Sequence, residues 1–265
     1  MAGIAHRPVT VVTGGGSGIG AALARAAASR GSLVAVADID EAAAREVADE
    51  VGGLGVRCDV SQRADLDDVA AAVSERWGRA DLLINNAGVG SHGRLVDTTA
   101  DDWRWMMGIT FDGVVNGVAA FLPLLERSEH GRIVNVASMS AVSPLPGLGA
   151  YAAAKSAVLA YSEVLSAELA EAGSAITVSV ALPGPVRTRI ATSMRNRRAG
   201  DEVGLVDVEL PAASLALMIE PDIAAERILR EAEAGEPYIA THPQLGRRPQ
   251  ERFAAILRAF DDAPA

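Results

Sequence analysis

The sequence is poor in cysteine and histidine. Cys58 is the only cysteine, so no intrachain disulfide can form, and a reducing compartment, the cytoplasm, is expected. The four histidines, at 6, 92, 130 and 242, are scattered without the spacing of metal ligands, so we expect no metal site.

Long apolar segments and excess positive charge are also missing. The N-terminus, MAGIAHRP, has no apolar signal-peptide core, and no stretch of about 18 residues is free of charges and turn formers. We therefore predict neither a signal peptide nor a membrane span. The net charge of −10 argues against a nucleic-acid partner or an anionic membrane. A hydrophobic content of 49% excludes a disordered chain, and we expect one domain over residues 1–265.

What the chain does contain is an alternation of short β-branched runs with Ala-rich helical segments. This pattern is typical of a parallel sheet covered by helices on both faces. We predict strands at 9–12, 33–37, 56–58, 82–84, 132–136, 176–181 and 238–240. We predict helices from the glycine-rich turn to about 30 and at 41–51, 64–77, 101–126, 151–172, 221–234 and 253–260. The unusual residue clusters all follow strands, at the sheet edge where ligands bind.

The first cluster is a glycine-rich turn, TGGGSGIG, over residues 13–20. Such a turn can bring backbone N–H groups close to a pyrophosphate at the positive N-terminus of a helix. A strand before it and a helix after it favour a dinucleotide site over a flexible turn. Two glycine spacings fit, one on Gly16, Gly18 and Ala21 and the other on Gly14, Gly18 and Gly20. The predicted contacts are Gly14, Ser17, Gly18, Ile19 and Gly20.

An acidic residue, Asp38, ends the second predicted strand. A carboxylate there can accept hydrogen bonds from an adenosine ribose and would repel a 2′-phosphate. No base lies beside it, since Ile39 follows and Ser17 occupies the glycine turn. The residues therefore predict NAD rather than NADP as the cofactor.

A Tyr and a Lys lie four residues apart, at Tyr151 and Lys155, with Ser138 upstream. The segment between them should be helical, which puts phenol and ammonium on one face. A free tyrosine has a pKa near ~10, and a cation at ~4 Å supplies roughly 4 kcal/mol towards its ionisation. Such a tyrosine can act as an acid/base near neutral pH. By itself the spacing is common by chance and is usually that of a surface pair.

Together, and in order, these motifs resemble the single-domain branch of the short-chain dehydrogenase/reductase family. The resemblance covers about residues 10–190 and includes the glycine turn, Asn85-Asn86-Ala87-Gly88, Ser138, Tyr151-x-x-x-Lys155 and Pro183-Gly184-x-x-x-Thr188. It implies a Rossmann-type doubly wound parallel sheet of about seven strands with helices on both faces. It also implies a homodimer or homotetramer and NAD(P)-dependent interconversion of an alcohol and a carbonyl compound.

The resemblance also implies roles for individual residues. Tyr151 would exchange the proton of the substrate hydroxyl, and Ser138 would hydrogen-bond the same oxygen. Lys155 would lower the pKa of Tyr151 and hold the nicotinamide ribose. The further implied cofactor contacts are Asp59, Val60, Asn86, Ala87, Gly88, Pro183, Gly184, Val186 and Thr188.

One position departs from the family pattern. The family has an asparagine where this chain has Thr110, and Asn116 would lie on another helix face. A mid-helix threonine can hydrogen-bond back to the i−4 carbonyl and bend the helix. A backbone carbonyl at the bend could then still bind a water. We expect activity to survive.

Two further segments bear on substrate and assembly. Residues 185–218 are long enough for a substrate lid, and their basic run 195–198 is expected to be a solvated face. The helix at 151–172 is apolar nearly all round, which predicts contact with a second subunit, as does the helix at 253–260. The loop after Ser138 predicts an apolar pocket lined by Met139, Val142, Leu145 and Leu148.

The sequence thus predicts an NAD-dependent oxidoreductase acting on a hydrophobic or alicyclic secondary alcohol or ketone. Two alternatives remain open: an NADPH-dependent carbonyl reductase, and a non-catalytic dinucleotide sensor of the same fold.

Overall fold

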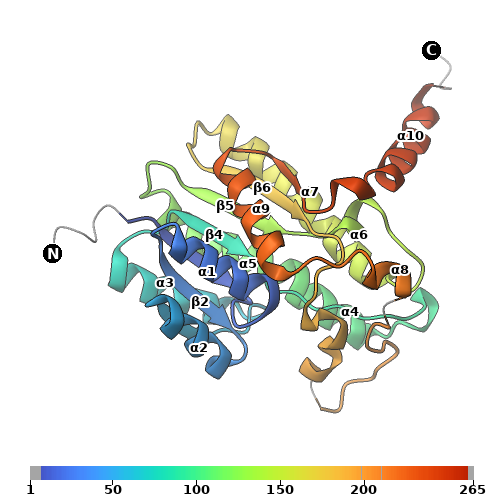
Figure 1. Ribbon diagram of the computed structural model, residues 1–265, viewed down its shortest axis with the longest axis horizontal. Coiled ribbons are helices and arrows are strands. Elements are labelled where there is room, and N and C mark those ends of the chain that lie inside the picture. Colours follow the sequence, from blue (N-terminus) through green and yellow to red (C-terminus); the bar gives the residue numbers. More distant parts are fainter. Residues whose placement is uncertain (1–6, 198, 210, 262–265) are drawn as a thin grey trace.

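The computed structural model describes residues 7–197, 199–209 and 211–261. Within these ranges one parallel sheet of seven strands has the order β3-β2-β1-β4-β5-β6-β7 (Figure 1). The strands are β1 (Val9–Thr13), β2 (Leu33–Asp38), β3 (Leu54–Arg57), β4 (Leu82–Asn85), β5 (Arg132–Val136), β6 (Thr177–Leu182) and β7 (Tyr238–Ala240). The order changes direction between β1 and β4, which makes their carboxyl ends the switch point where such sheets bind ligands. The predicted fold class is confirmed.

Helices cover both faces of the sheet. One layer contains α1 (Gly18–Ser29), α2 (Glu41–Val51) and α9 (Pro221–Glu233), and the other contains α3 (Arg63–Trp77), α5 (Gly113–Leu125) and α7 (Gly149–Glu171). The strands are apolar on both sides because each layer needs a core. Val11 packs with the α3–α5–α7 layer, whereas Val12, which points the opposite way, packs with the α1–α2–α9 layer.

The predicted helix at 101–126 is divided into three pieces. An α-helix, α4 (Ala100–Met107), leads into a π-helical turn, η2 (Gly108–Asp112), and then into α5. Glycines let α5 approach the sheet closely. A Cβ at Gly113 would lie 2.8 Å from Val60 Cγ2, and one at Gly117 would lie 2.1 Å from Asn85 Oδ1. The stretch Ala100–Leu125 is the one segment of the described ranges with the length and mean hydropathy, 1.5, of a membrane span. Half of its most apolar window is buried in the fold.

Strand β3 begins two residues before the prediction, at Leu54. Glycine is unfavourable in a strand, so the sequence pattern placed the start later. The reason for Gly55 is close packing, because a Cβ there would lie 2.8 Å from the Cα of Arg45 on α2. Short elements complete the chain: η1 (Leu95–Asp97), α6 (Met139–Val142), η3 (Arg189–Asn196), α8 (Ala212–Leu215) and η4 (Pro243–Leu245).

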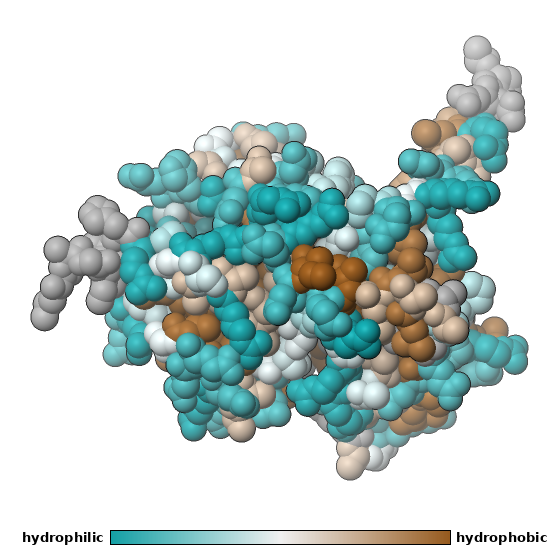
Figure 2. Space-filling model, in the orientation of Figure 1, coloured by the Kyte–Doolittle hydropathy of each residue, from teal (hydrophilic) through white to brown (hydrophobic). Residues whose placement is uncertain are grey.

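The last helix, α10 (Arg247–Asp261), begins earlier than predicted and projects away from the body (Figure 1). Its surface shows both hydrophilic and hydrophobic residues (Figure 2). The large apolar side chains lie at helical spacing and are exposed: Phe253, Ile256, Leu257 and Phe260.

Candidate active site

The glycine-rich turn at the carboxyl end of β1 has the geometry of a nucleotide cradle. Gly14 and Gly18 have φ of +61° and +55°, where a side chain would be strained. A Cβ at Gly20 would lie 2.1 Å from the carbonyl oxygen of Gly14, so only glycine fits there. The structure therefore favours the spacing Gly14, Gly18 and Gly20 over the alternative that uses Ala21, which is an ordinary core residue of α1.

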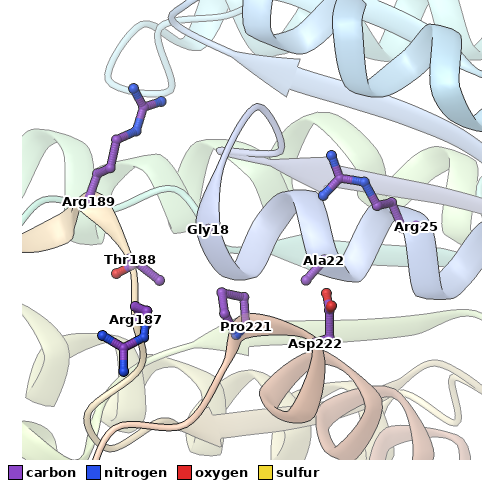
Figure 3. A pocket seen from close by; sticks show the side chains of 8 residues that line it. All are labelled: Gly18, Ala22, Arg25, Arg187, Thr188, Arg189, Pro221 and Asp222. Carbon is purple, nitrogen blue, oxygen red and sulfur yellow. The ribbon is translucent and has the colours of Figure 1, made fainter. Parts of the chain in front are cut away.

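The N-terminus of α1 is open to an anion. Ser17 holds the N-cap position, and among the described residues no side-chain cap bond is formed by it and no acidic residue lies in the first turn. Gly18 borders a cavity of about 450 Å³, and Thr188 faces it from the segment after β6 (Figure 3). Arg187 and Arg189, on either side of Thr188, point in opposite directions. Unpaired N–H groups at a helix N-terminus favour phosphate oxygens.

Asn86, at the end of β4, braces this turn. Its Nδ2 donates to the carbonyl oxygens of Thr13, at 3.0 Å, and Gly14, at 3.1 Å. The backbone N–H groups of Asn86 and Ala87 both donate to Thr13 Oγ1. Asn86 and Ala87, from the predicted segment 86–88, thus hold the shape of the glycine turn directly.

Asp38 lies beside the same turn, at the end of β2. One carboxylate oxygen accepts a hydrogen bond from Gly16 N–H at 2.9 Å, and the other accepts one from Asp40 N–H at 3.0 Å. These bonds fix the carboxylate next to the glycine turn, and Ile39 beyond it is exposed.

The β3 end contributes Asp59 and Val60. Asp59 Oδ1 accepts hydrogen bonds from both the N–H and the hydroxyl of Ser61. Val60 is buried, and its carbonyl oxygen accepts a hydrogen bond from Asn116 Nδ2 at 3.0 Å. Asn116 therefore faces β3 and not the Tyr–Lys pair, as the sequence predicted.

Ser138 and Tyr151 meet at the carboxyl end of β5. Ser138 caps α6, and its Oγ accepts a hydrogen bond from Ser140 N–H at 3.1 Å. Burial raises the pKa of Tyr151, and a side-chain hydrogen bond with Ser138 opposes that rise. Tyr151 packs against an apolar cluster of Val89, Met106, Ala150, Ala154 and Leu205.

Lys155, the only lysine in the chain, is buried, with 2% of its surface exposed. Its Nζ donates to the carbonyl oxygen of Val136 at 2.7 Å and lies 6.0 Å from the ring centroid of Tyr151. Burial lowers the pKa of Lys155 to about 8. A Cβ at Gly88 would lie 3.3 Å from this Nζ, so the β4 segment packs closely on the lysine.

The pKa of Tyr151 therefore moves in the opposite direction from the sequence argument. Helix spacing alone suggests an ammonium about 4 Å from the phenol and takes no account of desolvation. In the structure burial dominates for both groups, and Lys155 Nζ donates to the backbone at the end of β5.

Thr110 lies in the π turn η2 and is fully buried. The irregular helix expected there is present, but the predicted bond to the i−4 carbonyl is wrong. The Thr110 hydroxyl lies 3.7 Å from Met106 Sδ, the side chain at that same position. The π turn thus distorts the backbone near Thr110, and the Thr110 hydroxyl donates a hydrogen bond to the Met106 sulfur.

A buried polar chain behind the site was missed at the sequence level. Asn85 Nδ2 donates to Asn135 Oδ1 at 2.9 Å, and Asn135 Nδ2 donates to Ser162 Oγ at 2.8 Å. It ties β4 and β5 to α7, the helix that carries Tyr151 and Lys155. Asn135 within the otherwise apolar part of β5 was the available signal, because buried amides require partners.

The turn after β6 connects the Ser138 loop with the glycine turn. The carbonyl oxygen of Pro183 accepts a hydrogen bond from Met139 N–H at 2.9 Å. A Cβ at Gly18 would lie 3.0 Å from Thr188 Cγ2, so these two residues are close neighbours. Val186 is buried. The structure thus brings this predicted segment beside both Ser138 and the glycine turn.

The described part of the 185–218 segment is fastened to α4. Arg197 forms an ion pair with Asp102 at 3.3 Å, has a side chain only 6% exposed, and stacks on Trp105 at 5.1 Å. The prediction of a solvated face is therefore wrong for Arg197, although Arg195 is exposed, and Arg198 lies outside the described residues. The buried Asp102 carboxylate would be costly without a cation, and Arg197 supplies that cation.

The four residues predicted to line a pocket differ in surroundings. Val142 is buried in a core cluster with Ala137 and Val158, and Met139 packs partly against that cluster. Leu145 is 40% exposed, and Leu148 is the N-cap residue of α7. In the described ranges no group of three or more His, Cys, Asp or Glu side chains is arranged to hold a metal ion.

Comparison with known proteins agrees with this geometry. A family model described as short chain dehydrogenase matches residues 8–199. The chain is 35% identical over 242 residues to a probable oxidoreductase, EphD, of Mycobacterium bovis, covering 88% of this chain but only 40% of that protein. It is 30% identical over 272 residues to a CLA biosynthesis dehydrogenase/reductase of Lactiplantibacillus plantarum, covering 97% of this chain and 94% of that protein.

A solved structure of a short-chain dehydrogenase/reductase has the same fold. A short-chain dehydrogenase/reductase from Burkholderia phymatum, in complex with NAD, superposes with a TM-score of 0.87 at 32% identity, covering 98% of this chain and 96% of that one. The chain belongs to the short-chain dehydrogenase/reductase family.

Proposed function

We propose that the protein is an NAD-dependent oxidoreductase that interconverts a secondary alcohol and a ketone. The observation that carries this proposal is the meeting of Ser138, Tyr151 and Lys155 beside the carboxyl end of β5. The glycine turn, one strand beyond β4 in the same sheet, supplies a cradle for a dinucleotide next to them.

The residues present fit NAD. The cradle at Gly14, Gly18 and Gly20 admits no side chain, and the α1 N-terminus offers N–H groups to a pyrophosphate. Asp38 would accept the adenosine ribose hydroxyls and would repel a 2′-phosphate. When bound, NAD supplies the hydride acceptor for alcohol oxidation or, reduced, the hydride donor for ketone reduction.

Other residues would hold the remaining parts of the cofactor. Asp59 and Val60 would contact the adenine, and the segment 86–88 would support the cofactor from β4. Lys155 would hold the nicotinamide ribose, and the turn Pro183, Gly184, Val186 and Thr188 would hold the carboxamide.

Proton transfer would fall to Tyr151. Its phenol would accept the proton of the substrate hydroxyl in oxidation and return it in reduction, while Ser138 hydrogen-bonds the same oxygen. Burial raises the pKa of this phenol, and the Ser138 hydrogen bond opposes that rise. The Lys155 cation, whose Nζ lies 6.0 Å from the ring centroid, would favour the phenolate further. With a pKa of about 8, that lysine is mostly cationic at neutral pH.

A hydrophobic or alicyclic substrate is supported by the apolar surroundings of Tyr151. Its cluster includes Leu205 from the 185–218 segment, and Trp103 packs against the same cluster. We propose that this segment is a lid over a single domain spanning residues 1–265. The test is a screen of hydrophobic secondary alcohols with NAD and of the matching ketones with NADH, followed by NADH absorbance. If neither direction gives turnover above that of the Tyr151→Phe variant, the proposal fails.

We also propose a cytoplasmic homodimer or homotetramer. Val164, on the outer side of α7, is 56% exposed, and α10 presents an uncovered stripe from Phe253 to Phe260. A second copy of the chain would cover these apolar faces. Sedimentation showing a monomer at micromolar concentration would contradict this assembly.

A further inference from the structure

His242 is a buried histidine that the proposed reaction does not use. It follows β7 and is 1% exposed. Its Nδ1 lies 3.2 Å from Gly184 N and 2.7 Å from Thr241 Oγ1, and its Nε2 lies 3.1 Å from the carbonyl oxygen of Leu217. One ring therefore contacts both ends of the proposed lid.

The partners determine which ring nitrogen carries the proton. Gly184 N–H can only donate, so Nδ1 must accept, and the Thr241 hydroxyl can donate to the same nitrogen. The Leu217 carbonyl can only accept, so Nε2 must carry the hydrogen. The neutral imidazole with hydrogen on Nε2 satisfies every contact. Gly184 N–H is shared, because Thr241 Oγ1 also lies 3.2 Å away.

The first contact fixes a peptide at the candidate active site. The Pro183–Gly184 peptide is held at its carbonyl by Met139 N–H, the residue after Ser138, and at its N–H by His242. The ring also lies against Gly184, where a Cβ would be 2.7 Å from Nδ1. Both edges of this peptide plane are thereby held, which sets the direction of the turn that follows.

The second contact lies at the base of the lid. Val186 pairs with Ile219 in an isolated parallel bridge, with Arg187 N–H donating to Ile219 O at 3.0 Å and Ile219 N–H donating to Pro185 O at 3.2 Å. The Leu217 carbonyl, two residues before Ile219, accepts from His242. The histidine therefore ties the returning strand of the lid to the loop after β7.

We propose that His242 is a positioning residue with two separable tasks. Through Nδ1 it orients the Pro183–Gly184 peptide, and through Nε2 it fastens the end of the lid at Leu217. The first task rests on the proposed role of the Pro183–Thr188 turn in holding NAD. The second depends only on the lid's attachment.

Two substitutions separate these tasks. An asparagine amide oxygen can take the place of Nδ1 and accept from Gly184, but it does not reach Leu217. A glutamine amide nitrogen can take the place of Nε2 and donate to Leu217, while leaving Gly184 with Thr241 alone. His242→Leu removes both contacts, and His130→Gln, at an exposed histidine, serves as the matched control.

Three measurements distinguish the variants: NAD affinity by calorimetry, kcat and KM with an alcohol found in the screen, and the rate of tryptic cleavage after Arg187, Arg189 and Arg195. His242→Gln should weaken NAD affinity about tenfold, the effect of one lost buried hydrogen bond, with cleavage unchanged. His242→Asn should retain NAD affinity, speed cleavage and raise KM more than it lowers kcat. His242→Leu should show both losses.

The proposal is overturned if the Asn and Gln variants do not differ from each other in NAD affinity or in the rate of cleavage. This holds whether both variants match the wild type or both lose stability to the same extent. Thermal unfolding by circular dichroism measures that stability. If the wild-type chain does not bind NAD, the proposed function fails, whereas the cleavage comparison still decides the lid attachment.

Discussion

Replacing Lys155 by methionine should make the protein inactive and yet more stable. Burial lowers the pKa of Lys155 from 10.5 to about 8, so the folded state disfavours its charged form. That difference corresponds to about 3 kcal/mol of free energy of unfolding lost at pH 7, where folded and unfolded chains both carry the proton. The hydrogen bond from Lys155 to the Val136 carbonyl offsets about 1 kcal/mol of this loss in the free energy of unfolding. Lys155→Met should therefore raise the free energy of unfolding by about 2 kcal/mol at pH 7.

The pH dependence gives a sharper signature. Between about pH 8 and 10.5 the unfolded chain binds this proton and the folded chain does not, so wild-type stability rises with pH across that window. The variant lacks this rise, and its advantage should disappear by pH 10.5. Urea unfolding at several pH values from 7 to about 10 measures the difference, in which all other titrating groups cancel.

A less stable variant at pH 7, or a stability difference that does not change with pH, would show that burial does not disfavour the charged form of Lys155. The pKa can also be observed directly. Because the chain has one lysine, reductive methylation with a carbon-13 label gives a single side-chain resonance, resolved from that of the N-terminal amine, whose titration reports Lys155.

Three other variants, the first a double substitution, test separate parts of the site. Asp38→Ser with Ile39→Arg should reverse a preference for NAD over NADP of about 50-fold in kcat/KM, because the carboxylate that repels a 2′-phosphate is exchanged for a cation; an unchanged preference would contradict the role of Asp38. Thr110→Asn should change turnover by less than about tenfold, and a gain of several orders of magnitude would show that threonine cripples the site. Arg197→Met should cost about 3 kcal/mol in the free energy of unfolding by leaving Asp102 buried without its cation; a loss below about 1 kcal/mol would contradict the buried pair.

Much of the fold could be predicted from the sequence because its signals are local. Each β-branched run became a strand, and the residues that follow β1, β2, β4 and β5 meet at one edge because parallel strands place their carboxyl ends together. The choice between two glycine spacings could not be made from sequence. It depends on what a Cβ at Gly20 would touch, which is the carbonyl of Gly14 across the turn.

The site was less predictable where burial determines a pKa or the partner of a charged or polar side chain. Helix spacing correctly puts Tyr151 and Lys155 on neighbouring turns, but it contains no desolvation, so it gave the wrong direction for the tyrosine pKa. Arg197 looked like part of a solvated basic run because its partner, Asp102, lies far away in the chain. The contacts of His242 with Gly184 and Leu217 are equally non-local.

The acid/base role of Tyr151 is tested by comparing Tyr151→Phe with Tyr161→Phe, a matched change on the same helix. Tyr161 packs edge-on against Phe111. NADH formation and NAD affinity are measured for both variants and the wild type. We expect Tyr151→Phe to lower kcat by about 10²- to 10⁴-fold with NAD affinity unchanged, whereas Tyr161→Phe keeps both. Equal turnover in the two variants would contradict Tyr151 as the acid/base.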